Sequence, residues 1–125
     1  MVEIKNTTKR NLYSGVPFTD IAEKILGKNF NLSLVFIGDQ KAKNLNKKFL
    51  NKSYPTNVLA FPLSKTAGEI FINLNRAGRD HLKYQQKLKN HIAYLFIHAC
   101  LHLKGYEHGS TMDSKEIKLM EHFKF

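Results

Sequence analysis

Three histidines near the end of the chain have types and spacing that suit a metal ion. His98 and His102 are four residues apart, and residues four apart lie on the same face of a helix. Gly105 should end that helix, because glycine enters the left-handed conformation without steric cost, and the turn lets His108 approach as a third ligand. Zinc held by three protein ligands keeps a fourth position open for water or substrate. The pattern predicts one Zn²⁺ ion in a hydrolytic site.

The residue after the first histidine argues against one class of hydrolase. The same run matches the H-x-x-x-H-x-x-G-x-x-H skeleton of metzincin proteases, in which a glutamate follows the first histidine and acts as general base. Here that residue is Ala99, which cannot accept a proton. Peptide hydrolysis by that route is therefore disfavoured. Glu107, beside His108, is a weak candidate for a catalytic role that would orient water or a ligand, and an exposed or purely supporting carboxylate is the alternative.

The charge balance indicates the kind of partner. The chain has 20 Lys and Arg residues against 10 Asp and Glu residues, a formal net charge of +10, and this sign attracts polyanions such as nucleic acid. A solubilising role for the lysines is the alternative. Residues 41–52 contain several lysines and no acid, and the candidate contacts to nucleic acid within them are Lys43, Lys47, Lys48 and Lys52. These could equally be a solvated helix face.

Length and cysteine content limit the class of protein. A chain of 125 residues predicts one domain, residues 1–125, that buries about two thirds of the surface of the unfolded chain. Cys100 has no second cysteine to pair with, which is typical of a reducing cytosol, and we expect it in the core. No apolar run reaches the roughly 20 residues of a membrane span, and no targeting segment is recognised. We therefore expect a cytoplasmic protein without membrane contact.

The pattern of apolar residues predicts an α+β fold with a small mixed sheet. Strands are expected at residues 2–5 (an edge strand), 32–36 (half-buried), 58–61 and 69–74. Helices are expected between Pro17 and Gly27, from the cap Asp39 to residue 50, at 86–104, and around an apolar stripe of Ile117, Met120 and Phe123. Residues 51–55 read as a loop, and 75–86 as a loop or short helix. The helix at 86–104 is apolar nearly all round, which predicts a buried central element that carries the metal-binding histidines.

Two blocks of the sequence resemble one family. The run from His98 to His108 is similar to the H-G-x-L-H-L-x-G-Y-D-H signature of the YbeY-type endoribonucleases, with Ala99 in place of glycine and Glu107 in place of aspartate. The run from Pro55 to Pro62 is similar to that family's P-T-[DN]-V-L-S-F-P segment, and residues 68–70 to its G-D-I. The resemblance covers nearly the whole chain.

The resemblance implies a zinc-dependent, single-strand-specific endoribonuclease. In this family the activity belongs to ribosomal RNA processing, small ribosomal subunit maturation and ribosome quality control, so the implied partners are ribosomal RNA and the small subunit. His98, His102 and His108 would carry over as the metal ligands, and no small organic cofactor is implied. The implied fold, a mixed sheet packed against helices around the histidine helix, agrees with the expectation from the residues.

Two departures from the family pattern leave a second reading open. Leu50 stands where the family usually has an arginine, and Ala60 where it has a serine. A guanidinium could clamp a phosphate with two donors and stabilise the charge that develops during cleavage, whereas leucine can do neither. The alternative function is therefore a metal-stabilised RNA-binding or ribosome-binding assembly factor with weak or vestigial catalysis.

Overall fold

The computed structural model describes residues 1–11, 15–50, 57–83 and 87–125. The predicted loop at 51–55, the start of the Pro55–Pro62 block and Lys52 lie outside these ranges. In chain order the elements are β1 (Val2–Asn6), α1 (Phe18–Leu26), β2 (Asn31–Ile37), α2 (Asp39–Leu50), β3 (Val58–Ser64), β4 (Ala67–Asn73), α3 (Leu74–Lys83), α4 (Leu88–Lys104) and α5 (Ser110–His122). The undecided segment at 75–86 is therefore mostly helix, as α3.

The four strands form one mixed sheet in the order β1-β2-β4-β3. β1 pairs parallel with β2, and β2 pairs parallel with β4. β3 pairs antiparallel with β4, with Leu59 opposite Phe71. The predicted edge position of β1 is thus confirmed, and so is the mixed α+β class.

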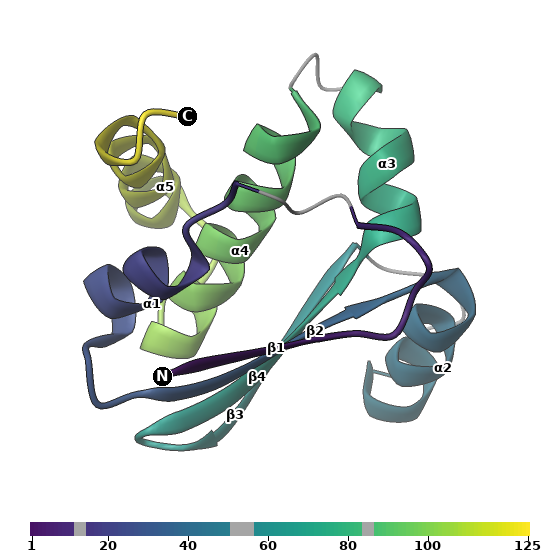
Figure 1. Cartoon of the computed structure of the whole chain (residues 1–125). Helices are drawn as coiled ribbons and strands as arrows, with labels where there is room; N and C mark the ends of the chain where they lie inside the picture. Colours follow the sequence, from purple (N-terminus) through teal and green to yellow (C-terminus); the bar gives the residue numbers. More distant parts are fainter. Residues whose placement is uncertain (12–14, 51–56, 84–86) are drawn as a thin grey trace.

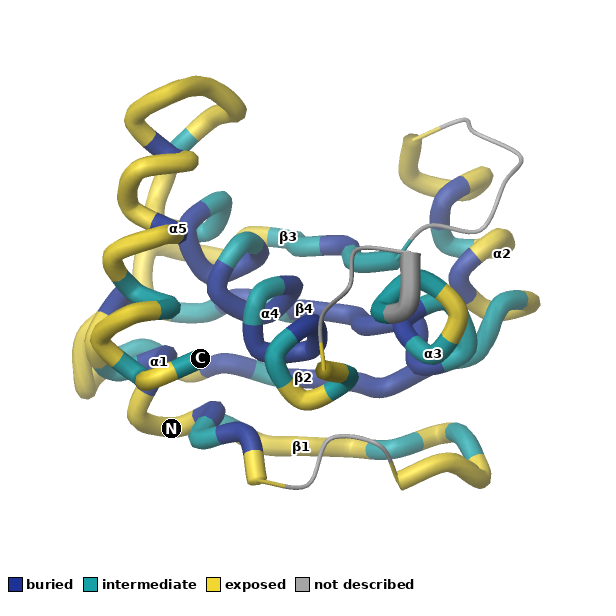
Figure 2. Tube along the Cα trace, turned by 90° about the horizontal axis from the view of Figure 1, so that it is seen from above, coloured by how far each residue is buried: buried dark blue, intermediate teal, exposed yellow. Residues whose placement is uncertain are grey.

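Both faces of the sheet are covered. Leu34 and Phe36 of β2 pack with α1 and α4 in the larger core cluster. Val35 and Ile37, which point to the opposite face, pack in a second cluster with Ala42 of α2. The prediction of a half-buried strand is therefore wrong for β2, because a helix covers each of its faces. Figure 2 shows this burial in the middle strands, whereas β1 is largely exposed.

Helix α4 is the central element of the larger cluster. It lies across the sheet beside α1 and α5 (Figure 1), and nine of its 17 residues are buried. Phe96 meets Phe18 of α1 edge to face, with 4.9 Å between ring centroids. Cys100 is buried, as predicted, and burial raises the pKa of its thiol. The expectation of a buried helix that carries the histidines is confirmed.

The end of α4 also agrees with the prediction. Gly105 has φ 109°, in the left-handed region, and its amide donates to the carbonyls of His102 and Leu101. An L-residue is strained at this torsion, whereas glycine is not. The chain can therefore leave the helix sharply after His102.

Helix α5 corrects the predicted apolar stripe. Ile117 is 61% exposed, whereas Met112 and Glu116 are buried, Glu116 with only 4% of its surface accessible. The face of α5 that packs inward is therefore not the face that carries Ile117. Met120 and Phe123, the other two residues of the predicted stripe, do pack against the core. The prediction failed at Glu116, because a charged residue is expected at the surface. Glu116 is buried instead, since its carboxylate pairs with His98.

Asp39 has a different role from the predicted helix cap. It lies in the first turn of α2, where the first helical hydrogen bond runs from the Ala42 amide to the Gly38 carbonyl. Its carboxylate accepts two hydrogen bonds from the Arg79 guanidinium, at 2.8 and 3.0 Å, and a third from Asn73 at 2.9 Å. The bond to Arg79 holds the pKa of Asp39 below its ordinary value. Asp39 thus connects α2 to α3 and β4.

Within the described ranges, every helix is too short or too polar to cross a membrane.

We expect Ile92→Ala to reduce the free energy of unfolding by about 2–5 kcal/mol, because truncation of a buried isoleucine loses apolar contacts and leaves a cavity. Ile92 is fully buried in α4, whereas Ile117 is largely exposed on α5. The matched change Ile117→Ala should therefore alter stability by less than about 0.5 kcal/mol. Chemical denaturation followed by circular dichroism measures both. Equal losses would contradict the orientation of α5.

Candidate metal centre

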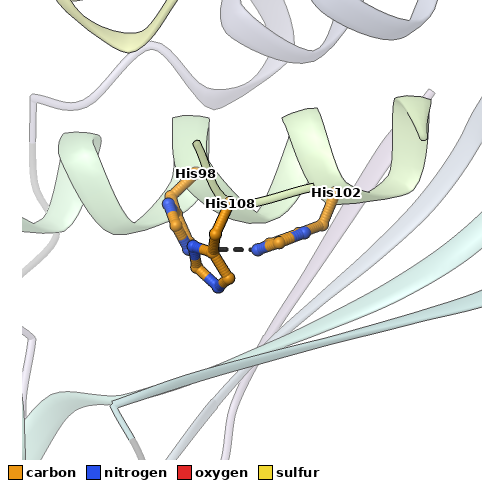
Figure 3. A group of neighbouring side chains, drawn as sticks. All are labelled: His98, His102 and His108. Atoms are coloured by element: carbon orange, nitrogen blue, oxygen red, sulfur yellow. Dashed lines mark hydrogen bonds between the residues drawn. The ribbon is translucent and has the colours of Figure 1, made fainter. Parts of the chain in front are cut away.

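The structure brings the three predicted histidines together. His98 and His102 extend from the same side of α4, and His108 reaches them from the loop that follows Gly105 (Figure 3). One ring nitrogen from each residue lies within 4.8 Å of the others. His98 and His102 are partly buried and His108 is exposed, so the cluster opens to solvent on the side of the third ring.

Hydrogen bonds to the Nδ1 atoms orient the two helical histidines. His98 Nδ1 lies 2.8 Å from Glu116 Oε1, and His102 Nδ1 lies 3.0 Å from the backbone carbonyl oxygen of Tyr106. A carbonyl oxygen can only accept, so the Nδ1–H of His102 donates to it. The Nε2 atom of a neutral His102 then has a free lone pair, and the same holds for a neutral His98 that donates to the carboxylate.

The two Nε2 atoms face each other at a distance that fits a shared metal ion. They are 3.2 Å apart, and two ligands of a tetrahedral zinc with Zn–N of about 2.0–2.1 Å are separated by about 3.3 Å. Two lone pairs at this distance repel each other unless a proton or a cation lies between them. The donor set is therefore suited to a metal ion, and these three histidines could hold one.

The surroundings favour the form of His102 that binds metal. Desolvation by burial lowers the pKa of His102, and the neighbouring His98 lowers it further. The imidazole therefore stays neutral to a lower pH than an exposed histidine, and only the neutral ring can coordinate a metal. His91, seven residues before His98 on α4 and outside this cluster, is buried, and desolvation lowers its pKa as well.

Glu116 is the residue at the potential metal site that the sequence did not reveal. Its carboxylate comes from α5, 18 positions after His98, and it fixes the ring of a potential ligand in the way that carboxylates support zinc-bound histidines. The predicted candidate, Glu107, is exposed, and within the described part of the chain it has no hydrogen bond or ion pair. The only signal for Glu116 was its place between Met112 and Met120, on the same face of a helix.

A cleft of about 310 Å³ adjoins the histidines. Helices α2 and α4 and strand β3 form its walls, which are lined by Asn46, Leu50, Asn57, Val58, Leu59, Ala60, Ala99 and the three histidines. Leu50 and Ala60, two of the positions at which the chain departs from the family pattern, therefore line the cleft beside the potential metal site. Asn46, which is buried and polar, was not predicted as part of it. Ala99 offers this cleft no general base.

The predicted lysine contacts lie on the same helix as part of this cleft, but they do not line it. Lys43, Lys47 and Lys48 are exposed on α2, and the Lys48 ammonium lies 5.3 Å from the centre of the Phe49 ring. The end of α2 instead brings Leu50, which is 48% exposed, to the cleft. Lys52 lies outside the described residues.

The protein is of the α+β class, with a potential metal site at the mouth of a cleft. The site is formed by two histidines of a buried helix, which packs on a mixed four-stranded sheet, and by a third histidine on the following loop. The chain belongs to the endoribonuclease YbeY family, because the model of that family matches residues 2–124.

Relatives and a solved structure agree with this assignment. The endoribonuclease YbeY of Mycoplasma mycoides subsp. mycoides SC is 39% identical over an alignment of 102 residues, with 70% of this chain and 62% of that protein covered. The endoribonuclease YbeY of Mycoplasma capricolum is 35% identical over 127 residues, with 88% of this chain and 77% of that protein covered. The solution structure of TM1509 from Thermotoga maritima matches 99% of this chain and 92% of its own with a TM-score of 0.68 at 22% identity, which supports the fold.

Removal of the Glu116 carboxylate should weaken the binding of a metal ion at the three histidines, with zinc as the test ion. We expect Glu116→Ala to reduce the affinity about 10- to 100-fold, because the ring of His98 loses the partner that orients it. Glu116→Gln should lose less, since its amide oxygen can still accept from Nδ1. Competition with a chromogenic chelator measures the affinity, and circular dichroism checks folding. Glu107→Gln is the matched control, and an equal loss in that variant would contradict the assignment.

Proposed function

We propose that this protein is a zinc-dependent endoribonuclease that cleaves single-stranded RNA in the bacterial cytoplasm. Its place would be in ribosomal RNA processing, small ribosomal subunit maturation and ribosome quality control, with ribosomal RNA and the small subunit as partners. The observation that carries the proposal is the cluster of three imidazoles, with two Nε2 atoms 3.2 Å apart, at a cleft in a chain of this family.

The residues of the site have distinct tasks in this proposal. His98, His102 and His108 would hold the ion, which would supply Lewis-acid chemistry for hydrolysis of an RNA phosphodiester bond. Glu116 and the Tyr106 carbonyl would accept a hydrogen bond from Nδ1–H of the two helical histidines, which would leave Nε2 of each ring to coordinate the ion. The exposed side of His108 leaves room for an RNA strand.

Positive charge on α2 would hold the RNA backbone. Lys43, Lys47 and Lys48 project to solvent from the helix that ends at the cleft, and phosphate neutralisation by lysines is the main source of sequence-independent affinity for nucleic acid. We include Lys52 in the same set, since it follows this helix closely in the sequence. Such contacts position the strand without reading its sequence.

One observation favours a second candidate function. Leu50 lines the cleft beside the histidines, where an arginine would stabilise the charge that develops on a phosphate. Without it, the protein would bind RNA or the ribosome as a metal-stabilised assembly factor with weak catalysis.

Loss of one proposed ligand should abolish cleavage. Loss of a residue that only hydrogen-bonds a metal ligand typically reduces activity about 10- to 100-fold. We expect His98→Ala, which removes a ligand itself, to reduce the rate of cleavage of single-stranded RNA by more than this. A chelator should have the same effect on the unmodified protein, and added zinc should reverse it. His81→Ala, on α3 and outside the cluster, is the control. Unchanged cleavage by a folded, pure His98→Ala protein would reject the proposed metal-dependent nuclease activity.

Restoring an arginine at position 50 distinguishes the two functions. We expect Leu50→Arg to raise the rate of RNA cleavage roughly tenfold or more, because the guanidinium adds two donors at the cleft. Leu63→Arg adds the same charge at a leucine that is 66% exposed and does not line the cleft. A gain at position 50 alone would indicate a weakened nuclease. Tight RNA binding without turnover in every form would instead favour the assembly factor.

A further inference from the structure

A second hollow lies outside the metal cleft. It has a volume of about 450 Å³ and is formed by α1, the C-terminal end of α4, and α5, which lie together on one side of the molecule (Figure 1). Its lining includes Lys24 from α1, Lys104 from α4, and Lys115 and Lys118 from α5. We call this hollow with its four lysines the basic groove.

The charge of the basic groove is not balanced locally. Among the described residues, none of the four lysines takes part in an ion pair, and no carboxylate lines the groove. All four side chains are exposed. Like charges from three helices around one hollow repel each other, and an anion that bridges them relieves this repulsion. The groove is therefore complementary to a ligand with several negative charges.

The rest of the lining suits a nucleotide better than a simple anion. Tyr106, an aromatic residue that is partly buried against the core, lines the groove together with the apolar Leu101 and Leu119. Lysines that follow the phosphates, together with an aromatic ring on which a base can stack, are the features by which proteins hold single-stranded nucleic acid.

Tyr106 also connects the basic groove to the metal centre. Its carbonyl oxygen accepts the hydrogen bond from His102 Nδ1, and His108 follows it by two residues. Two residues span at most about 7 Å between Cα atoms. A single strand that passes the histidines can therefore continue around the loop into the groove.

We propose that the basic groove binds the sugar-phosphate backbone of the same single-stranded RNA that the metal centre cleaves, a short distance along the strand from the scissile phosphate. This inference rests on the proposed function, to which it adds a second site of contact with the substrate. Its consequence is that the affinity for RNA depends on α5 and on the end of α4, and not only on α2.

The test compares two variants of equal charge. The groove variant carries Lys104→Gln, Lys115→Gln and Lys118→Gln, and the control carries Lys5→Gln, Lys9→Gln and Lys65→Gln, three exposed lysines that do not line the groove. Both are made in the His98→Ala protein so that RNA stays intact. Fluorescence anisotropy with a labelled single-stranded oligoribonucleotide measures the affinity over a range of salt concentrations.

We expect the groove variant to bind at least about tenfold more weakly at low salt than the control. The slope of log affinity against log salt should become shallower by about 2, because each phosphate contact on a single strand contributes about 0.7. Equal losses in both variants would show that net charge alone matters and would overturn the proposal. Unchanged affinity of the groove variant would overturn it too, as would displacement of the RNA by inorganic phosphate at the same phosphate concentration.

Cleavage by the protein with its native His98 separates this test from that of the nuclease. If that protein cleaves RNA and the groove variant binds RNA normally, only the proposal that the basic groove binds RNA is rejected. If it does not cleave RNA but the groove variant binds RNA weakly, the groove stands as an RNA-binding site and the proposed nuclease activity is rejected.

Discussion

The hydrogen bond between Glu116 and His98 connects the packing of this protein to its chemistry. The carboxylate of a glutamate that is only 4% exposed is costly to bury unless a polar group satisfies it, and here that group is a ring at the potential metal site. The bond brings α5 against α4 and directs Nε2 of His98 toward His102. The docking of the last helix and the orientation of the cluster therefore depend on the same contact.

Local features of the sequence predicted much of the site. The separation of His98 and His102 by four residues and the glycine at position 105 act within one turn of helix, so their consequences did not depend on the rest of the fold. Glu116 could not be predicted in this way, because its role depends on where α5 packs. The same reason explains the misplaced stripe at Ile117. Each of these errors concerns a contact between elements, whereas the elements themselves were mostly correct.

The second layer of the fold was also hidden from the sequence. β2 alternates too weakly to show that α2 covers its far face, where Val35 and Ile37 pack. Because α2 lies there, its last residue reaches the cleft that β3 and α4 form. The sequence shows only that Leu50 departs from the family pattern. The fold shows in addition that Leu50 lines the same cleft as the histidines.

The backbone at Gly105 connects the geometry of the potential metal centre to the packing of the last helix. A Cβ atom at this position would meet no other atom within 4 Å, so glycine is required by its torsion of φ 109° and not by lack of space. Strands β1 to β4 and helices α1 to α4 precede this turn, whereas His108 and the buried Met112 and Glu116 of α5 follow it. The direction in which the chain leaves the turn therefore sets both the position of the third potential ligand and the packing of the last helix, so a change in the turn would alter the two together.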